Sequence, residues 1–174
     1  MKNNAKIAII GYSGSGKSTL AEYLSERLSL PVLYIDTVQF KPGWVIREHE
    51  EKLGAVRAFL DENAERGWVI DGNYRKLEYE RRMEEADLIV FMNFNRLNCF
   101  VRAWKRAIRY KGKTRPSMTV GCDEKFDREF RTWILRKGRT KEVRARFADL
   151  VRRYPDKTKV VKNQRQLDEF MKTI

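Results

Sequence analysis

Residues 11–18, Gly-Tyr-Ser-Gly-Ser-Gly-Lys-Ser, match the pattern G-x-x-x-x-G-K-[ST] near the start of the chain. Glycines at these positions let the backbone curve around an anion with its N–H groups turned inward. Lys17 offers a compact positive charge to terminal phosphates, and the Ser18 hydroxyl is a suitable ligand for Mg²⁺. The pattern predicts a nucleoside triphosphate site; the alternative is a Gly/Ser turn that only joins a strand to a helix.

Two aspartates stand where predicted strands end, Asp36 after residues 32–35 and Asp71 at the end of residues 68–71. Ligands of open α/β sheets lie off the carboxyl ends of strands, so both carboxylates are expected to face the same site. At such a position Asp71 could hold magnesium through water. The following loop, residues 37–44, carries Phe40 and Trp44, which either pack onto the surface or form one wall of an acceptor pocket.

The elements that must position these residues alternate between strands and helices. Strands are predicted at residues 6–10, 32–35, 68–71, 86–93 and 158–161, and the fourth, apolar on both faces, is expected to be central. Helices are predicted at residues 18–28, 47–66, 77–85, 95–110, 127–154 (broken near Gly138) and 163–174. This alternation favours one three-layer α/β domain over residues 1–174, with a five-stranded parallel sheet and helices on both faces.

Two further segments have a distinctive pattern. Residues 111–126 contain no periodicity, and a loop of this length in a small domain is usually functional or mobile, so we expect a lid segment there. In the helix predicted before it, Phe100, Trp104, Ala107 and Ile108 form an apolar stripe beside a ridge of arginines.

Charge is distributed unevenly in this 174-residue chain of net charge +13. Residues 1–95 carry 13 Lys and Arg against 15 Asp and Glu, whereas residues 96–174 carry 24 against 9. A basic half could bind nucleic acid or a membrane surface, or supply arginines to a triphosphate. No apolar run approaches the roughly 20 residues of a membrane helix. We therefore expect no membrane partner. Cys99 and Cys122 lack zinc-ligand spacing, which favours free thiols in a cytoplasmic protein.

Five marks together resemble the adenylate-kinase-like P-loop kinases. They are the loop at residues 11–18, Asp36, the turn Asp71-Gly72-x-x-Arg75, an arginine-bearing lid and a polar loop after the fifth strand. More closely, Phe40-x-Pro42-Gly43-Trp44, Asp71-Gly72-Asn73-Tyr74 and the run at residues 162–166 are similar to bacterial DNA topology modulation proteins. That label describes a genetic effect and names no acceptor.

The resemblance implies ATP and Mg²⁺ as ligands and assigns roles to matching residues. The implied catalytic residues are Lys17, Asp71, Asp36 and Arg115, with Ser18 and Asp71 at the metal. The implied acceptor-binding residues are Asp36, Trp44 and Arg75. The implied nucleotide-binding residues are Gly11, Ser13, Gly14, Ser15, Gly16, Lys17, Ser18, Thr19, Asn163 and Arg165, the last two lying against the adenine.

Two functions are therefore compatible with the sequence. The first is an ATP-dependent kinase of a small-molecule or nucleotide acceptor, in which a closing lid excludes water and an arginine such as Arg115 stabilises developing charge. The alternative is a nucleotide-regulated protein that binds DNA through its basic carboxyl-terminal half and affects DNA topology. The first is favoured, because many of the basic residues lie in and beside the predicted lid.

Overall fold

A parallel five-stranded sheet forms the centre of the molecule in the computed structural model, which describes residues 4–174. Its strands are β1 (Lys6–Gly11), β2 (Val32–Tyr34), β5 (Trp68–Asp71), β6 (Leu88–Met92) and β7 (Thr158–Val161). They lie in the order β2-β5-β1-β6-β7, and every pairing is parallel. The middle strand is β1, with β6 beside it, because the crossovers place later strands on both sides of the first.

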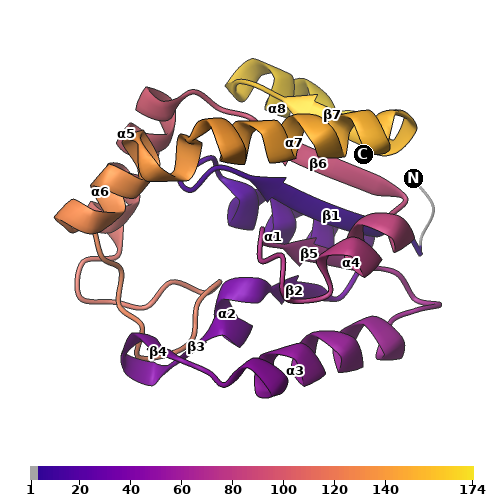
Figure 1. The fold of residues 1–174 in the computed structure, drawn as a ribbon, viewed down its shortest axis with the longest axis horizontal. Helices are drawn as coiled ribbons and strands as arrows, with labels where there is room; N and C mark the ends of the chain where they lie inside the picture. The colour runs from indigo at the N-terminus through magenta and orange to yellow at the C-terminus, as the bar shows by residue number, and fades with distance from the viewer. Residues whose placement is uncertain (1–3) are drawn as a thin grey trace.

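Helices cover both faces of this sheet, which confirms the predicted three-layer α/β fold (Figure 1). In Figure 1, α7 (Lys141–Arg153) crosses the near side of the sheet, and α1 (Lys17–Leu28) lies behind it. The Tyr23 hydroxyl of α1 donates to the Met171 carbonyl at the end of α8 (Gln164–Met171), so these two helices share one face. The remaining longer helices are α3 (His49–Glu62), α4 (Tyr79–Glu85), α5 (Arg96–Arg109) and α6 (Arg128–Leu135).

The segment that follows β2 is more ordered than a loop. A short helix, α2 (Ile35–Gln39), begins directly after the strand, and Ile35 and Val38 anchor it by burying their side chains on one face. A small hairpin follows, formed by β3 (Phe40–Lys41), the 3-10 turn η1 (Pro42–Trp44) and β4 (Val45–Ile46). Asp36 therefore lies in the first turn of a helix and not in an open loop.

The predicted break near Gly138 is present. Helix α6 ends at Leu135, the 3-10 turn η2 (Lys137–Arg139) follows, and α7 begins after Thr140, whose side chain accepts a hydrogen bond from the Val143 N–H. A side chain at position 138 would crowd Trp133, because a Cβ there would lie 2.9 Å from the Trp133 carbonyl oxygen. The last 3-10 turn, η3 (Pro155–Lys157), leads into β7.

The lid segment, residues 111–126, contains neither helix nor strand, as predicted, but it is tied to the hairpin. The Thr119 hydroxyl lies 2.8 Å from the Phe40 carbonyl oxygen, and the Gly43 N–H donates to the Gly121 carbonyl at 2.9 Å. Cys122 in the lid is buried. The lid is thus docked against the segment that carries Trp44.

The prediction for α5 was wrong about its buried face. Cys99 and Ala103 are fully buried, whereas Trp104 and Ile108 are 49% and 59% exposed. The reason is the close approach of α5 to the glycine-rich loop, where only small side chains fit: a Cβ at position 14 would lie 3.3 Å from the Ala103 Cβ and 2.4 Å from the Cys99 carbonyl oxygen.

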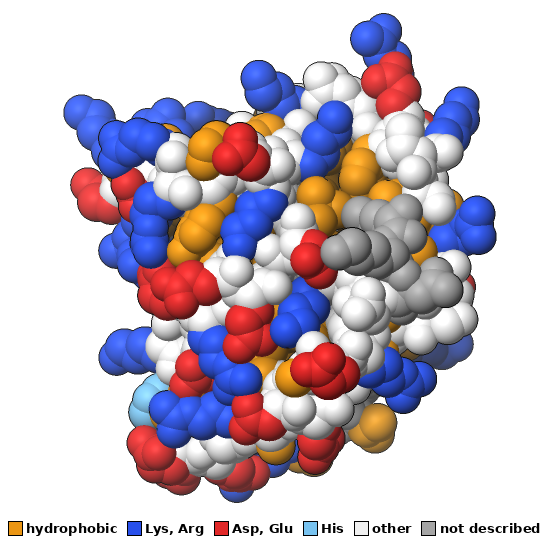
Figure 2. All heavy atoms as spheres, turned by 90° about the vertical axis from the view of Figure 1, so that its right-hand side faces the viewer, with side chains coloured by type: hydrophobic (Ala, Val, Ile, Leu, Met, Phe, Trp, Pro, Cys, Tyr) orange, Lys and Arg blue, Asp and Glu red, His pale blue; other side chains and the backbone are white. Residues whose placement is uncertain are grey.

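The surface opposite the carboxyl ends of the strands mixes charges. Figure 2 shows acidic and basic side chains interspersed on the face that forms the right-hand side of Figure 1. Within residues 4–174, no helix combines the length and apolar composition needed to cross a bilayer.

Candidate active site

The glycine-rich loop, residues 11–18, joins the middle strand to the start of α1. Gly14 and Gly16 have φ values of 79° and 98°, a region that favours glycine. Gly11 has φ 141°, and a Cβ there would lie 2.5 Å from the Met92 carbonyl oxygen. Because α1 begins at Lys17, the loop places the positive end of a helix dipole at its own concave side.

A neighbouring turn holds this loop in place. The Asn73 side chain accepts from the Gly11 N–H at 2.9 Å and donates to the Gly11 carbonyl at 2.7 Å. The turn is itself held by Arg82, which is fully buried and donates to the carbonyls of Gly72, Tyr74 and Leu77 at 3.0, 2.8 and 3.1 Å. Burial lowers the Arg82 pKa to about 10. Sequence reasoning missed both side chains.

Ser18 and Asp71, the predicted metal residues, are in direct contact. The Ser18 hydroxyl donates to Asp71 Oδ2 at 2.6 Å, while Oδ1 is buried without a hydrogen-bond partner among the described residues. Burial raises the Asp71 pKa, and the charge of Lys17 partly opposes that rise. The Lys17 ammonium donates to the Tyr12 carbonyl at 3.2 Å. A buried carboxylate oxygen with no partner beside a hydroxyl is the donor set that Mg²⁺ takes when phosphates supply its other ligands.

Protein side chains alone do not build a closed metal site in the described chain. No three His, Cys, Asp or Glu residues cluster within residues 4–174 in a way that could hold a metal ion. A metal ion held by Ser18 and Asp71 would take most of its ligands from water and phosphate oxygens, as Mg²⁺ usually does at nucleotides.

Asp36 lies across from this pair and contacts the lid. Its Oδ1 accepts from the Tyr74 hydroxyl at 2.8 Å, and its Oδ2 lies 3.1 Å from Arg115 Nη2. Burial and the Asp36 charge raise the Tyr74 pKa. Arg115 also lies 3.7 Å from Glu124, which in turn accepts from Arg106 Nε at 2.7 Å. An aspartate on α2 and an arginine of the lid thus form one ion-pair network.

The other two predicted acceptor residues lie elsewhere. The Trp44 indole N–H donates to the Asp123 carbonyl at 3.1 Å, so this side chain contacts the lid. Arg75 is exposed, lies over the Tyr79 ring and lines a cavity of about 250 Å³ between the glycine-rich loop, α4 and α7. The structure therefore separates Arg75 from Asp36, although Tyr74 next to Arg75 contacts Asp36 directly.

The polar residues after β7 lie near a residue that the sequence did not single out. Asn163 caps α8, accepting from the Gln166 N–H, and Arg165 is 85% exposed and pairs with Glu169. Arg102 of α5 donates to the Ser15 carbonyl at 2.7 Å and contacts the Gln164 side chain. Arg102 thus links the glycine-rich loop to the start of α8. Its place in a basic ridge was the only sequence signal.

Comparison with known proteins gives a family and a fold. Residues 7–125 match the sequence model of a family described as AAA domain. No curated protein matches the chain. A gluconokinase from Sinorhizobium meliloti 1021 aligns at 18% identity and a TM-score of 0.49, over 99% of this chain and 90% of that one. An uncharacterized protein from Eubacterium ventriosum ATCC 27560 aligns at 15% identity and a TM-score of 0.51, over 98% and 99%. At 15% identity the likeness to the second protein concerns the fold alone.

Proposed function

This chain belongs to the AAA domain family of P-loop nucleotide-binding proteins, which includes kinases, and from that premise we propose that it is an ATP-dependent phosphotransferase. In this proposal it transfers the γ-phosphoryl group of ATP to a small-molecule or nucleotide acceptor. The observation that carries the proposal is the contact of Ser18 with Asp71, 2.6 Å long, at the end of a buried strand beside Lys17.

The residues around that contact suit the triphosphate. The N–H groups of residues 13–18 and the amino end of α1 would bind the β- and γ-phosphates, with Lys17 exchanging its bond to the Tyr12 carbonyl for a phosphate oxygen. Ser18 and Asp71 would hold Mg²⁺, which would supply positive charge to the β- and γ-phosphates when bound. Thr19 lies in the first turn of α1, where the helix dipole also favours anions.

The network of Asp36, Tyr74 and Arg115 suits the acceptor side. Phosphoryl transfer depends on positioning and on cations near developing charge more than on covalent chemistry. Asp36 would orient an acceptor hydroxyl and accept its proton. An incoming acceptor would break the ion pair between Arg115 and Asp36. Arg115 would then be free to stabilise the negative charge of the transferred phosphoryl group. Trp44 and Phe40 would close this side against water through their contact with the lid.

The adenine is proposed to lie beside the start of α8. Asn163 and Arg165 flank this edge, and Arg102 presents a guanidinium next to Ser15. Arginine planes stack well on bases, so Arg102 extends the set predicted from the sequence.

A closer relationship to DNA topology modulation proteins is a second proposal, which we favour less. It would include binding to DNA. Its support is the excess of 24 Lys and Arg over 9 Asp and Glu in residues 96–174. A cytoplasmic location is likewise proposed, since Cys99 and Cys122 are both unpaired and buried.

ADP release measured with a panel of nucleoside monophosphates, sugars and hydroxy acids tests the phosphotransferase proposal. We expect one acceptor class to raise ADP release above the rate with ATP alone, and Lys17→Ala to remove that increase while the protein stays folded. Lys105→Ala, an exposed residue of α5, is the matched control and should behave as the wild type. Turnover that survives Lys17→Ala would contradict the proposal.

A further inference from the structure

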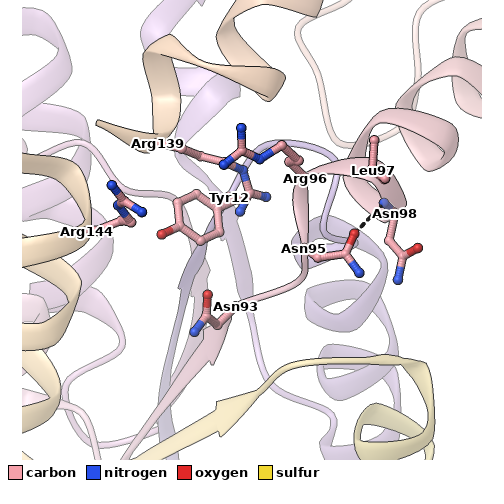
Figure 3. A pocket seen from close by; sticks show the side chains of 8 residues that line it. All are labelled: Tyr12, Asn93, Asn95, Arg96, Leu97, Asn98, Arg139 and Arg144. Atoms are coloured by element: carbon pink, nitrogen blue, oxygen red, sulfur yellow. Dashed lines mark hydrogen bonds between the residues drawn. The ribbon is translucent and has the colours of Figure 1, made fainter. Parts of the chain in front are cut away.

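A second pocket, of about 560 Å³, lies beside the glycine-rich loop between the start of α5 and the start of α7. Three arginines and three asparagines line it, together with Tyr12 and Leu97 (Figure 3). They are Arg96, Arg139, Arg144, Asn93, Asn95 and Asn98. The lining thus consists of hydrogen-bonding groups and positive charge, and none of these eight residues carries a carboxylate.

Arg96 and Arg139 lie on one side of the Tyr12 ring and Arg144 on the other, and Arg139 also donates to the carbonyls of Ile134 and Phe94. Figure 3 shows the three guanidinium groups gathered around the ring of Tyr12, and Arg139 lies 3.7 Å from the centre of that ring. None of the three forms an ion pair with a carboxylate within residues 4–174. Burial lowers the Arg139 pKa, and the charge of Arg96 lowers it further. An anion placed between these groups would relieve this repulsion.

The backbone at this pocket also favours an anion. Arg96, Leu97 and Asn98 form the first turn of α5, which is capped by Asn95, and Arg144 lies in the first turn and a half of α7. The amino end of α5 therefore lies at the pocket, where N–H groups not bonded to the Asn95 cap attract negative charge, whereas α7 contributes Arg144 alone to the lining. The nearest carboxylate of α7, Glu142, precedes Arg144 by two residues and does not line the pocket.

This pocket differs from the place where the triphosphate would bind. Of residues 11–18, only Tyr12 lines it, and the Tyr12 ring packs against Phe91 and Phe147 on the side of the sheet that α7 covers. Lys17 and Ser18 begin α1 on the other side of the sheet (Figure 1). The triphosphate site and this pocket would both include residues of the glycine-rich loop, but each would bind a different ligand.

We propose that the pocket of Arg96, Arg139 and Arg144 is a second anion site that binds the phosphate group of a small molecule other than the nucleotide. Its size lies in the range of small-molecule pockets, which is roughly 300–1,000 Å³. A nucleic-acid backbone needs a row of basic groups along a surface, whereas these three line one pocket. The Tyr12 carbonyl also accepts from Lys17, so a ligand bound in this pocket would affect the position of Lys17 at the triphosphate site.

The test uses inorganic pyrophosphate as a probe in the Lys17→Ala protein, where the first site is disabled. Isothermal titration should show saturable binding of one equivalent. Arg96→Gln and Arg144→Gln, both exposed and free of structural ion pairs in the described chain, should each weaken it about tenfold, the effect of losing one charge-assisted contact. Arg152→Gln, which removes one exposed charge from the same helix, is the matched control and should not weaken it.

Three results would overturn the proposal. They are absence of binding in folded Lys17→Ala protein, equal weakening by Arg152→Gln, and binding of a short single-stranded oligonucleotide that depends on Arg96 and Arg144 while pyrophosphate does not bind. The last result would place the phosphates in a nucleic acid. Because the binding is measured without ATP turnover, this test can succeed or fail independently of the proposed kinase activity.

Discussion

Replacing Asp71 with asparagine should stabilise the ligand-free protein while removing its stabilisation by ATP and magnesium. In the wild type, Asp71 is buried and its Oδ1 lacks a partner among the described residues. Such an unsatisfied buried group costs about 1–3 kcal/mol, and more when it is charged. Asparagine keeps the shape and still accepts from Ser18, but that bond falls from about 1.5–3 to about 0.5–1.5 kcal/mol. Its amide nitrogen takes the unpaired place of Oδ1, so the gain comes from removing the buried charge. The net gain is roughly 1 kcal/mol, or about 2–4 °C in Tm for a chain of this size.

The pH dependence gives this prediction a second readout. Burial raises the Asp71 pKa above its ordinary value of 3.8, so the folded state binds more protons than the unfolded state between these two values. The contribution of Asp71 to stability therefore falls as pH rises through that window and stays low above it. In Asp71→Asn this fall is absent, and the difference in Tm between the two proteins should grow with pH.

Thermal unfolding from about pH 4 to about pH 8, with and without ATP and magnesium, measures both effects. A ligand at 100 times its Kd stabilises the wild type by about 2.7 kcal/mol, and Asp71→Asn should lose most of this gain. Asp156→Asn, at an exposed position in η3, controls for the charge change. The reasoning is refuted if Asp71→Asn unfolds below the wild type at neutral pH, or if it keeps the full ligand shift.

Three further predictions test other parts of the site. Arg82→Met should lower the free energy of unfolding by about 3 kcal/mol or more in urea, since it leaves three carbonyls without their donor; a loss below about 1 kcal/mol would contradict this. Because Arg75 lies apart from Asp36, Arg75→Ala should leave both the acceptor KM and the Kd for ATP unchanged, and a raised acceptor KM alone would restore the acceptor role predicted from the sequence. We expect no measurable binding of duplex DNA at low salt; binding that weakens steeply with added salt would support the DNA alternative instead.

Local sequence patterns predicted the sheet and the glycine-rich loop because the residues that determine each of them are consecutive in the chain. The loop needs glycine at positions of positive φ and a lysine at the helix start, and both requirements appear in consecutive residues. The strand 68–71 is buried on both faces, so its apolar run and terminal aspartate could be identified without knowing its neighbours. The contact of Ser18 with Asp71 follows from the parallel pairing of β1 with β5. The order of the strands was not predicted, and the middle strand is β1 and not the strand expected at residues 86–93.

Other parts of the site depend on contacts between residues far apart in the chain. Asn73 looks like an ordinary turn residue until Gly11 is placed 2.9 Å from its side chain. Cys99 and Ala103 are small because α5 approaches the loop closely, and periodicity alone favours the larger side chains of Trp104 and Ile108 for the buried face. The fit between α5 and the glycine-rich loop therefore determines which face of α5 is buried, and the spacing of its apolar residues does not.

The basic excess of residues 96–174 is partly used inside the molecule, and this bears on what the protein binds. Arg102 donates to the loop at Ser15, and Arg106 and Arg115 contact Glu124, whose side chain is 5% exposed. Charges held in this way position the site and are not available to a DNA backbone. The net charge is therefore a poor measure of DNA binding, because it also counts guanidinium groups that are bonded within the protein. Because several converge beside the glycine-rich loop, compact phosphorylated ligands fit this half of the chain better than an extended polyanion.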